Sequence, residues 1–275
     1  MRILITGSSG QIGTAAALAL IERGDEVVGL DCRPNPWTDR VATTVVDLTR
    51  CEPGELPVEG RFDVVVHLAA HAKVYELVEH PQRAMANVAM TFNVLEYCRR
   101  ADTPIVFGSS REVYGDIRRH VTEESQADFV VAESPYSASK ISGEAFIYSY
   151  AECYGLPCLV FRFSNVYGRF DCDLERMERV VPLFIRRIAR GEPIVVYGRE
   201  KVLDFTYVED CTAGLLRGID ALAAGRLKRE TINLAYDPRR PAPLETGLKM
   251  GDRILMGEGQ QYSEVEFILL PKEEL

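Results

Sequence analysis

The sequence predicts an α/β fold built on a parallel, doubly wound sheet, for two reasons. Over the first two-thirds of the 275 residues, short β-rich runs alternate with longer helical patterns, and this alternation is typical of βαβ units. Two of the short runs, residues 64–66 and 105–107, are continuously apolar, as expected for strands that are buried on both faces of a sheet.

The elements of that sheet can be placed in order along the chain. Pro81 suits the start of a helix, and Gly155 and Pro157 suit the end of another. We expect strands at residues 2–6, 26–31, 43–47, 62–69, 104–109 and 158–163, with helices at 11–23, 82–100 and 134–154 between them.

The pattern changes after Asn165, where the elements become shorter and less regular. From Tyr236 onward, prolines and glycines cluster and the periodicity is weak. We expect helices near residues 178–190 and at 213–224, and strands at 194–197, 204–208, 231–235 and 264–270.

Composition and charge exclude several classes of protein. With 32 Lys plus Arg against 41 Asp plus Glu, the net charge is −9, which argues against nucleic-acid or anionic membrane partners. No apolar run approaches the roughly 18–20 residues that span a bilayer. The seven cysteines include no C-x-x-C pair, so we expect free thiols and no metal site. The apolar run that begins at Met1 soon ends in a glycine turn, so we expect no signal peptide and a cytoplasmic location.

Three glycines have the spacing of a dinucleotide-binding turn, a spacing that ordinary βα turns can also show. Gly7, Gly10 and Gly13 follow the first expected strand and open the first expected helix. This spacing allows a tight turn, a close approach of the backbone to a pyrophosphate, and close packing of helix on strand. The start of the helix then offers N–H groups and a partial positive charge to the phosphates.

Two acids at strand ends bear on the identity of the dinucleotide. Asp31 ends the second strand, 18 residues after Gly13, where a carboxylate binds a ribose and repels a 2′-phosphate. This predicts NAD rather than NADP, although Arg33 nearby leaves NADP as an alternative. Asp47, at the end of the third strand, could receive the adenine amino group or could be a solvated strand-end acid.

A tyrosine and a lysine four residues apart suggest the chemistry. Tyr136 and Lys140 share one face of an expected helix, and Ser110 lies at the C-terminal end of a parallel strand, where ligands of such sheets bind. A free tyrosine has a pKa of about 10, and lowering it by about three units needs roughly 4 kcal/mol of phenolate stabilisation. The lysine cation and the NAD⁺ ring can supply this, so that the tyrosine removes a hydroxyl proton while hydride leaves the same carbon.

The motifs together resemble the extended short-chain dehydrogenases/reductases and, more narrowly, the NAD-dependent nucleotide-sugar epimerase/dehydratase family. The resemblance covers about residues 1–235. In chain order, the motifs are Gly7-Ser8-Ser9-Gly10-Gln11-Ile12-Gly13, Asp31, Asp47-Leu48, His67-Leu68-Ala69-Ala70, Asn87, Ser109-Ser110, Val113-Tyr114-Gly115, Tyr136-Ser137-Ala138-Ser139-Lys140 and Arg162-Phe163-Ser164-Asn165-Val166-Tyr167-Gly168.

The resemblance implies a role for each matching position. Those implied for the cofactor are Gly7, Gly10, Ile12 and Gly13 at the pyrophosphate, Asp31 at the adenosine ribose, Asp47 and Leu48 at the adenine, and Gln11, Cys32, Arg33, Leu68, Ala69, Ala70, Asn87, Ser109, Tyr136, Lys140 and Val166 elsewhere around it. The implied catalytic residues are Ser110, Tyr136 and Lys140. The residues implied for the substrate are Ser110, Glu112, Asn165, Val181, Pro182, Phe184 and Lys201.

The resemblance also implies an arrangement of the chain. We expect residues 1–165 to form an NAD-binding Rossmann domain, with 202–224 packing back on it. Residues 166–201 and 225–275 would then form a small, shortened substrate-binding region. Members of the family often dimerise through the helices here expected at 82–100 and 134–154, as a four-helix bundle. The apolar faces of these helices could instead belong to the intramolecular core.

One substitution discriminates between the reactions of the family. Dehydratases resemble Ser-Thr-Asp-Glu-Val-Tyr-Gly at the catalytic strand end, and here the aspartic acid is replaced by Arg111, which cannot be a general acid. We therefore expect a UDP-sugar 4-epimerase of the UDP-glucose/UDP-galactose type. The alternatives are a UDP-glucuronate-modifying epimerase or decarboxylase that uses Glu112, a 4,6-dehydratase, and a non-enzymatic NAD-binding sensor or scaffold. Glu112 could instead pair with a local cation.

Two departures from the family pattern concern the substrate. The arginine that usually binds the diphosphate is Leu203 here, and Lys201, Arg199 or Arg169 would have to replace it. Relatives usually continue for longer after the position of Ala235. We therefore expect the cover over the sugar to be small or supplied by a partner subunit.

Overall fold

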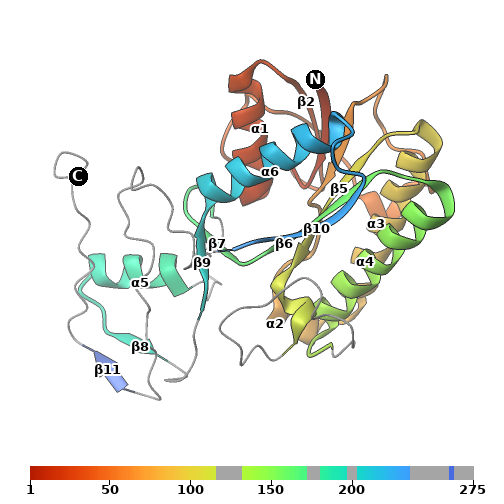
Figure 1. Ribbon diagram of the computed structural model, residues 1–275. Coiled ribbons are helices and arrows are strands. Elements are labelled where there is room, and N and C mark those ends of the chain that lie inside the picture. The colour runs from red at the N-terminus through yellow and green to blue at the C-terminus, as the bar shows by residue number, and fades with distance from the viewer. Residues whose placement is uncertain (116–131, 172–179, 197–202, 236–259, 263–275) are drawn as a thin grey trace.

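Seven parallel strands form the central sheet of the computed structural model, which describes residues 1–115, 132–171, 180–196, 203–235 and 260–262 (Figure 1). The strand order is β10-β6-β5-β4-β1-β2-β3. The strands are β1 (Arg2–Thr6), β2 (Glu26–Asp31), β3 (Ala42–Val45), β4 (Val64–His67), β5 (Ile105–Ser110), β6 (Cys158–Phe163) and β10 (Arg229–Leu234). Since β1 pairs with β2 on one side and β4 on the other, the winding reverses beside β1, and ligands of such sheets bind at the carboxyl ends of the strands there.

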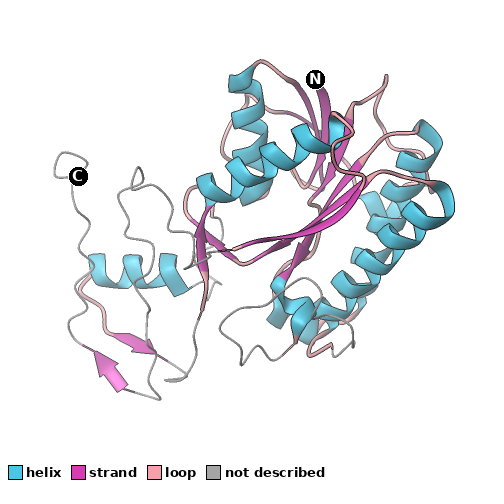
Figure 2. Cartoon of the chain, in the orientation of Figure 1, coloured by secondary structure: helices cyan, strands magenta, loops and turns pink. Residues whose placement is uncertain are grey.

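Helices cover both faces of this sheet (Figure 2). One face carries α1 (Gln11–Arg23) and α6 (Val208–Ala223), and the other carries α3 (Gln82–Ala101) and α4 (Pro135–Tyr154). The alternation of side chains along each strand supplies both cores. In β1, Ile3 and Ile5 pack under α1 and α6, while Leu4 packs under α3 and α4. The predicted α/β fold with a Rossmann-type parallel sheet is confirmed.

Smaller elements surround the carboxyl edge of the sheet. A short strand pair, β7 (Asn165–Tyr167) and β9 (Phe205–Tyr207), leads away from β6. Beyond it lie α5 (Val180–Ala189), β8 (Ile194–Val196) and β11 (Gln260–Tyr262), at the left of Figure 1. The remaining elements are η1 (Leu48–Arg50), α2 (Val74–Glu79) and η2 (Arg111–Tyr114).

Most boundaries agree with the sequence, and the disagreements have local causes. The strands at 2–6, 26–31 and 158–163 and the helix at 11–23 are confirmed at both ends. The helix expected from residue 213 instead begins at Val208, because Glu209 and Asp210 lie in its first turn, where acidic side chains favour a helix start. The strand expected at 264–270 lies outside the described residues.

The last strand of the sheet corrects one detail of the expected domain division. The sequence assigns residues 225–275 to the small region, but β10 pairs in parallel with β6 and forms the edge of the main sheet. Helix α6 packs beside α1. Among the helices of the described part of the chain, none is both long enough and apolar enough to cross a membrane.

The sheet makes a direct prediction about stability. Leu4 is fully buried in the central strand β1, so Leu4→Ala should lower the free energy of unfolding by about 2–5 kcal/mol through lost burial and a residual cavity. Val45→Ala, in the exposed edge strand β3, should change it by less than about 1 kcal/mol. Urea unfolding followed by circular dichroism measures both, and equal losses would contradict the placement of β1.

Candidate active site

The turn between β1 and α1 leaves no space for side chains at two of its glycines. A Cβ atom on Gly7, whose φ is +76°, would lie 2.7 Å from the backbone nitrogen of Ala69. A Cβ atom on Gly13 would lie 2.1 Å from the carbonyl oxygen of Gly7. Both contacts are too short for a side chain, so the turn requires glycine at these two positions.

Gly10 is not required by the packing of the turn in the same way. Its φ is −81°, and a Cβ atom would lie 3.3 Å from the carbonyl oxygen of Gly7, a tight contact that a small shift could relieve. Gly10 is the N-cap of α1, where no side chain caps the helix and no acidic residue lies in the first turn. The helix start therefore offers N–H groups and partial positive charge to an anion, and the glycine leaves room for a phosphate. These residues fit the pyrophosphate of NAD.

Asp31 lies beside this turn at the end of β2. Its side chain is buried, and it accepts hydrogen bonds from the backbone N–H groups of Ser9 (3.0 Å) and Arg33 (3.2 Å). The carboxylate is thus fixed next to the glycine turn, where the sequence places the adenosine ribose. Cys32, which follows it, is exposed overall. Partial burial of its thiol and, after that, the neighbouring Asp31 carboxylate raise the pKa of Cys32.

Asp47 has a local structural role. Its carboxylate accepts hydrogen bonds from the backbone N–H and hydroxyl groups of Thr49, and it lies 3.3 Å from the Arg50 guanidinium. These contacts lower the pKa of Asp47, the Thr49 hydrogen bond most of all. Asp47 is thus an exposed acid that caps the start of η1, while neighbouring Leu48 is buried in the core. A contact with the adenine stays a prediction.

Asn87 holds the segment that follows β4. Its amide oxygen accepts a hydrogen bond from the backbone N–H of His71 (2.7 Å), and its amide nitrogen donates to the carbonyl oxygen of His71 and the hydroxyl of Ser139 (both 3.1 Å). These bonds connect Ala69 and Ala70, through His71, to α3 and α4. Asn87 thus supports the site from its helix, in the position that the sequence gives it.

Ser110, Tyr136 and Lys140 gather at the carboxyl end of β5. Ser110 ends the strand, and its hydroxyl accepts a hydrogen bond from the backbone N–H of Glu112 (3.2 Å). Tyr136 and Lys140 are buried on successive turns of α4. The Lys140 ammonium group donates a hydrogen bond to the carbonyl oxygen of Gly108 (2.7 Å), two residues before Ser110. A direct hydrogen bond therefore joins α4 to the end of β5.

The charge of Lys140 lies beside the phenol. Its Nζ atom is 5.9 Å from the centre of the Tyr136 ring. Burial lowers the pKa of Lys140 to about 8, although the Glu144 carboxylate on the same helix opposes this in part. His67, also nearby, is buried and has a pKa lowered to about 3, mainly by burial, so it is neutral. The lysine is the positive charge next to the phenol, where it favours the phenolate.

The residues predicted for the substrate are less closely grouped. The side-chain amide of Asn165 donates a hydrogen bond to the carbonyl oxygen of Asp204 (2.7 Å), which fixes its orientation. Glu112 pairs with Arg111 at 3.1 Å, so the expected alternative of a local ion pair is present. Arg169 pairs with Glu209. Lys201 and Arg199 lie outside the described residues.

The small region beyond β7 has its own apolar cluster. Phe184 of α5 and Ile194 of β8 are buried, and Leu203 packs against them. Val181 and Pro182 are half-buried in the first turn of α5. Leu203 therefore stabilises this region at the position where the family usually has an arginine, and Phe184 contributes its ring to the same cluster. Contact of these residues with a nucleobase stays a prediction.

Glu144, which none of the sequence motifs includes, is buried and pairs with Arg162. Its signal was present, because Tyr136, Lys140 and Glu144 follow one another at intervals of four residues and so lie on one helical face.

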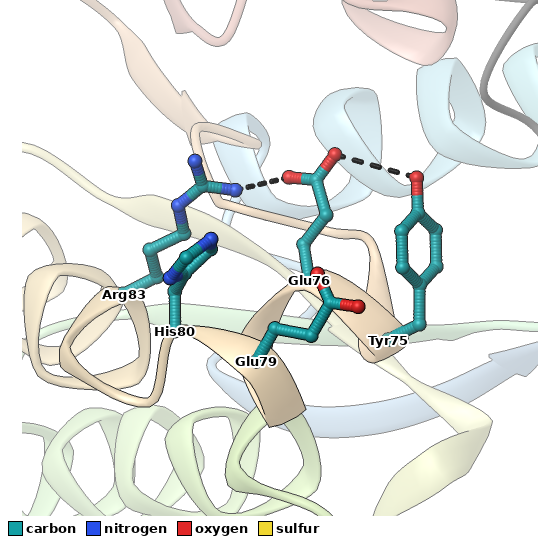
Figure 3. Close-up of a pocket in the computed structure, with 5 residues that line it drawn as sticks. All are labelled: Tyr75, Glu76, Glu79, His80 and Arg83. Atoms are coloured by element: carbon teal, nitrogen blue, oxygen red, sulfur yellow. Dashed lines mark hydrogen bonds and ion pairs between the residues drawn. The ribbon is translucent and has the colours of Figure 1, made fainter.

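A hollow of about 380 Å³ lies beside α2 and the start of α3 (Figure 3). Glu76 is at its centre, with the Tyr75 hydroxyl 3.4 Å away and the Arg83 guanidinium paired with it from α3. Arg83 lies one turn before Asn87, so this ion pair connects α2 to the helix that supports the site. The other residues that line the hollow are Glu79 and His80. Among the described residues, no group of His, Cys, Asp or Glu is arranged to hold a metal ion.

The sequence pattern that defines the NAD dependent epimerase/dehydratase family matches residues 3–235. The chain belongs to this family. NAD is the cofactor of the family, as the sequence predicts. One similar protein is UDP-glucuronate 4-epimerase 1 of Arabidopsis thaliana, which is 35% identical over 241 residues, covering 80% of this chain and 55% of that protein. The chain thus spans little more than half the length of the first curated relatives that it matches.

Solved structures of family members have the same fold. The UDP-glucose 4-epimerase of Thermotoga maritima with UDP-glucose has a TM-score of 0.77 and 28% identity, covering 86% of this chain and 77% of that one. The UDP-glucuronic acid 4-epimerase of Bacillus cereus, in complex with UDP-glucuronic acid and NAD, has a TM-score of 0.74 and 25% identity, covering 86% and 78%.

Alanine variants of Gly10 and Gly13 should distinguish an effect on cofactor binding from an effect on folding. Gly13→Ala forces a Cβ atom against the backbone of Gly7, so it should lower both the free energy of unfolding and the NAD content. Gly10→Ala should leave the free energy of unfolding within about 1 kcal/mol of the parent but still lose NAD, because its methyl group fills the space for the phosphate. Cofactor release on denaturation and urea unfolding measure the two effects. Full NAD content in Gly10→Ala would contradict this assignment.

Proposed function

We propose that this chain catalyses inversion at C4 of a UDP-sugar, with NAD as a bound cofactor. The observation that carries the proposal is the buried pair of Tyr136 and Lys140 on α4, bonded to β5 through Gly108, two residues before Ser110. This is a site for removing a proton from a hydroxyl group at the carboxyl edge of the sheet, next to a turn that fits a dinucleotide.

The residues act on the proton of the sugar hydroxyl. Ser110 holds the 4-hydroxyl group, and the Tyr136 phenolate takes its proton while Lys140 stabilises the phenolate. Bound NAD would supply the hydride acceptor and donor for C4. Loss of the C4–H bond and of the O–H bond of the 4-hydroxyl group would leave a carbonyl group at C4. The 4-keto sugar would then rotate within the site, and after reduction from its opposite face Tyr136 would return the proton to O4.

The strand end supports epimerisation over dehydration. Loss of a neighbouring hydroxyl group needs an additional proton donor, and Arg111 occupies the position of the aspartic acid that serves dehydratases. Arg111 is also paired with Glu112, which neutralises the carboxylate that a decarboxylase or dehydratase would use. Ser110, Tyr136 and Lys140 are sufficient for an epimerase.

We place UDP-glucuronate first among the substrates and UDP-glucose second. The first curated relatives carry the name UDP-glucuronate 4-epimerase, which supports the acid sugar. The Thermotoga maritima enzyme, with its TM-score of 0.77, supports the neutral pair UDP-glucose and UDP-galactose that the sequence pattern favoured.

We also propose a homodimer formed through α3 and α4. These helices pack on each other and still expose Met85 of α3 and Phe146 and Tyr154 of α4. Exposed apolar side chains on neighbouring helices are typical of a surface that another subunit covers.

Tyr136→Phe should reduce turnover at least about 100-fold, because it removes the group that carries the proton. NAD content should stay at the parent level, since the glycine turn and Asp31 are unchanged. Proton NMR of the sugar's anomeric signal measures turnover directly. Near-normal turnover in protein that holds NAD would contradict the role of Tyr136.

The same NMR assay identifies the substrate. We expect UDP-glucuronate to convert to UDP-galacturonate until a fixed ratio is reached, with UDP-glucose converted more slowly. Loss of the carboxyl carbon, abolished by Glu112→Gln, would replace the proposal with a decarboxylase. Absence of turnover and of binding for every UDP-sugar, with NAD still bound, would favour a sensor.

A further inference from the structure

A buried polar network lies directly behind the catalytic residues. The Glu144 carboxylate on α4 receives two hydrogen bonds from the Arg162 guanidinium on β6, at 3.0 and 2.7 Å. The same carboxylate accepts a hydrogen bond from the Ser109 hydroxyl on β5, at 2.5 Å. Glu144 and Arg162 are each only 5% exposed. Three elements of the fold therefore meet at one carboxylate.

Through this network, α4 is bonded to the catalytic end of β5 at two consecutive residues. Lys140 donates to the carbonyl oxygen of Gly108, and Glu144, one turn later, receives the hydroxyl of Ser109. The next residue of the strand is Ser110. Since the strand end and the helix are each fixed at two points, the distance between Ser110 and Tyr136 depends on both bonds.

The network also reaches the turn that follows Ser110. Arg162 donates a hydrogen bond to the Tyr114 hydroxyl in η2 at 2.9 Å, and that hydroxyl donates to the side-chain oxygen of Asn233 on β10, also at 2.9 Å. Arg162 thus holds the segment from Ser109 to Tyr114 directly at Tyr114 and through Glu144 at Ser109.

Stability alone does not account for this arrangement. Replacement of a buried ion pair by apolar residues of the same size is often neutral or stabilising, because of the cost of desolvating both charges. A fixed geometry next to reacting groups is a use that apolar residues cannot provide, because a small displacement of a catalytic group lowers its rate strongly.

We propose that Glu144, held by Arg162, is a positioning residue that sets Ser110 and Lys140 against Tyr136 for proton transfer. The inference rests on the proposed epimerase function of this site. In this role Glu144 acts through Ser109 on one side and Lys140 on the other.

The charges around Lys140 support this role. Glu144 is the carboxylate that raises the pKa of Lys140 against the effect of burial. Two other titratable groups lie near Lys140. His67 on β4 is neutral, and the Tyr136 phenol lies on the same helix as the lysine. Removal of the charge of Glu144 should therefore make Lys140 lose its proton at a lower pH, and the alkaline limb of the pH profile of kcat should move the same way.

Glu144→Gln, Ser109→Ala and Glu152→Gln in the NAD-loaded protein test the proposal. Glu152 is the matched control, because it lies two turns further along α4 in an ion pair with Arg229 whose side chains are exposed. In Glu144→Gln we expect kcat to fall about tenfold or more, with KM changed less than about threefold and the alkaline limb at lower pH. Ser109→Ala should lower kcat without moving the limb, and Glu152→Gln should match the parent. A Glu144→Gln variant with the parent's kcat and pH profile would overturn the proposal.

A second readout does not depend on turnover. Carbon-13 NMR of labelled lysine side chains, with the Lys140 signal assigned from Lys140→Met, should show a lower pKa of Lys140 in Glu144→Gln and no change in Glu152→Gln. If the parent turns over no UDP-sugar, the proposed function fails while this titration still supports or overturns the link between Glu144 and Lys140. If Glu144→Gln does not fold, Ser109→Ala decides, and parent-level kcat in that variant would overturn the positioning role.

Discussion

The close approach of α4 to β5 is the constraint on which the catalytic part of this molecule depends. A Cβ atom on Gly143 would lie 2.5 Å from the buried ring of Phe107 in β5, so any side chain at this position would force the ring or the helix to move. At that distance Lys140 can hydrogen-bond directly to Gly108, and Glu144 can hydrogen-bond directly to Ser109. A helix with a larger residue at 143 would hold the same side chains too far from the strand. The glycine is thus as much a part of the site as the groups that react.

A second constraint of the same kind operates at the cofactor end. Gly13 lets α1 pack against the turn that precedes it, and Gly7 lets that turn pack against the segment that follows β4, which Asn87 fixes from α3. Both ends of the site therefore depend on close contacts made by residues without side chains. Because the strands are parallel, the two ends open at the same edge of the sheet. A cofactor on the glycine turn and a sugar beside Tyr136 would meet there.

The sequence predicted the parts of this site that depend on local spacing. The glycine turn, Asp31 at the end of a strand, and the Tyr136–Lys140 pair follow from periodicity and from the parallel sheet. The pairing of Glu144 with Arg162 did not, because 18 residues separate them and a charged residue on a helix is more often solvated than buried. Leu203 is a similar case. The sequence shows that leucine stands where the family usually has arginine, but it does not show that Leu203 packs against Phe184 and Ile194. Short elements such as α2 and β7 were missed because their stability comes from tertiary contacts rather than from their own pattern.

The balance of charge in the buried site follows from these pairings. Glu144 and Arg162 neutralise each other through two direct hydrogen bonds, and His67 is neutral because burial lowers its pKa to about 3. Lys140 therefore carries the net charge of this buried group, with its Nζ atom 5.9 Å from the Tyr136 ring. A positive charge in a buried environment favours an adjacent anion, and in the proposed mechanism the Tyr136 phenolate is that anion. Arg162 holds the Glu144 carboxylate by two hydrogen bonds, while the Lys140 ammonium group donates to the carbonyl oxygen of Gly108. The pairing of Glu144 with Arg162 therefore leaves the charge of Lys140 beside the tyrosine ring.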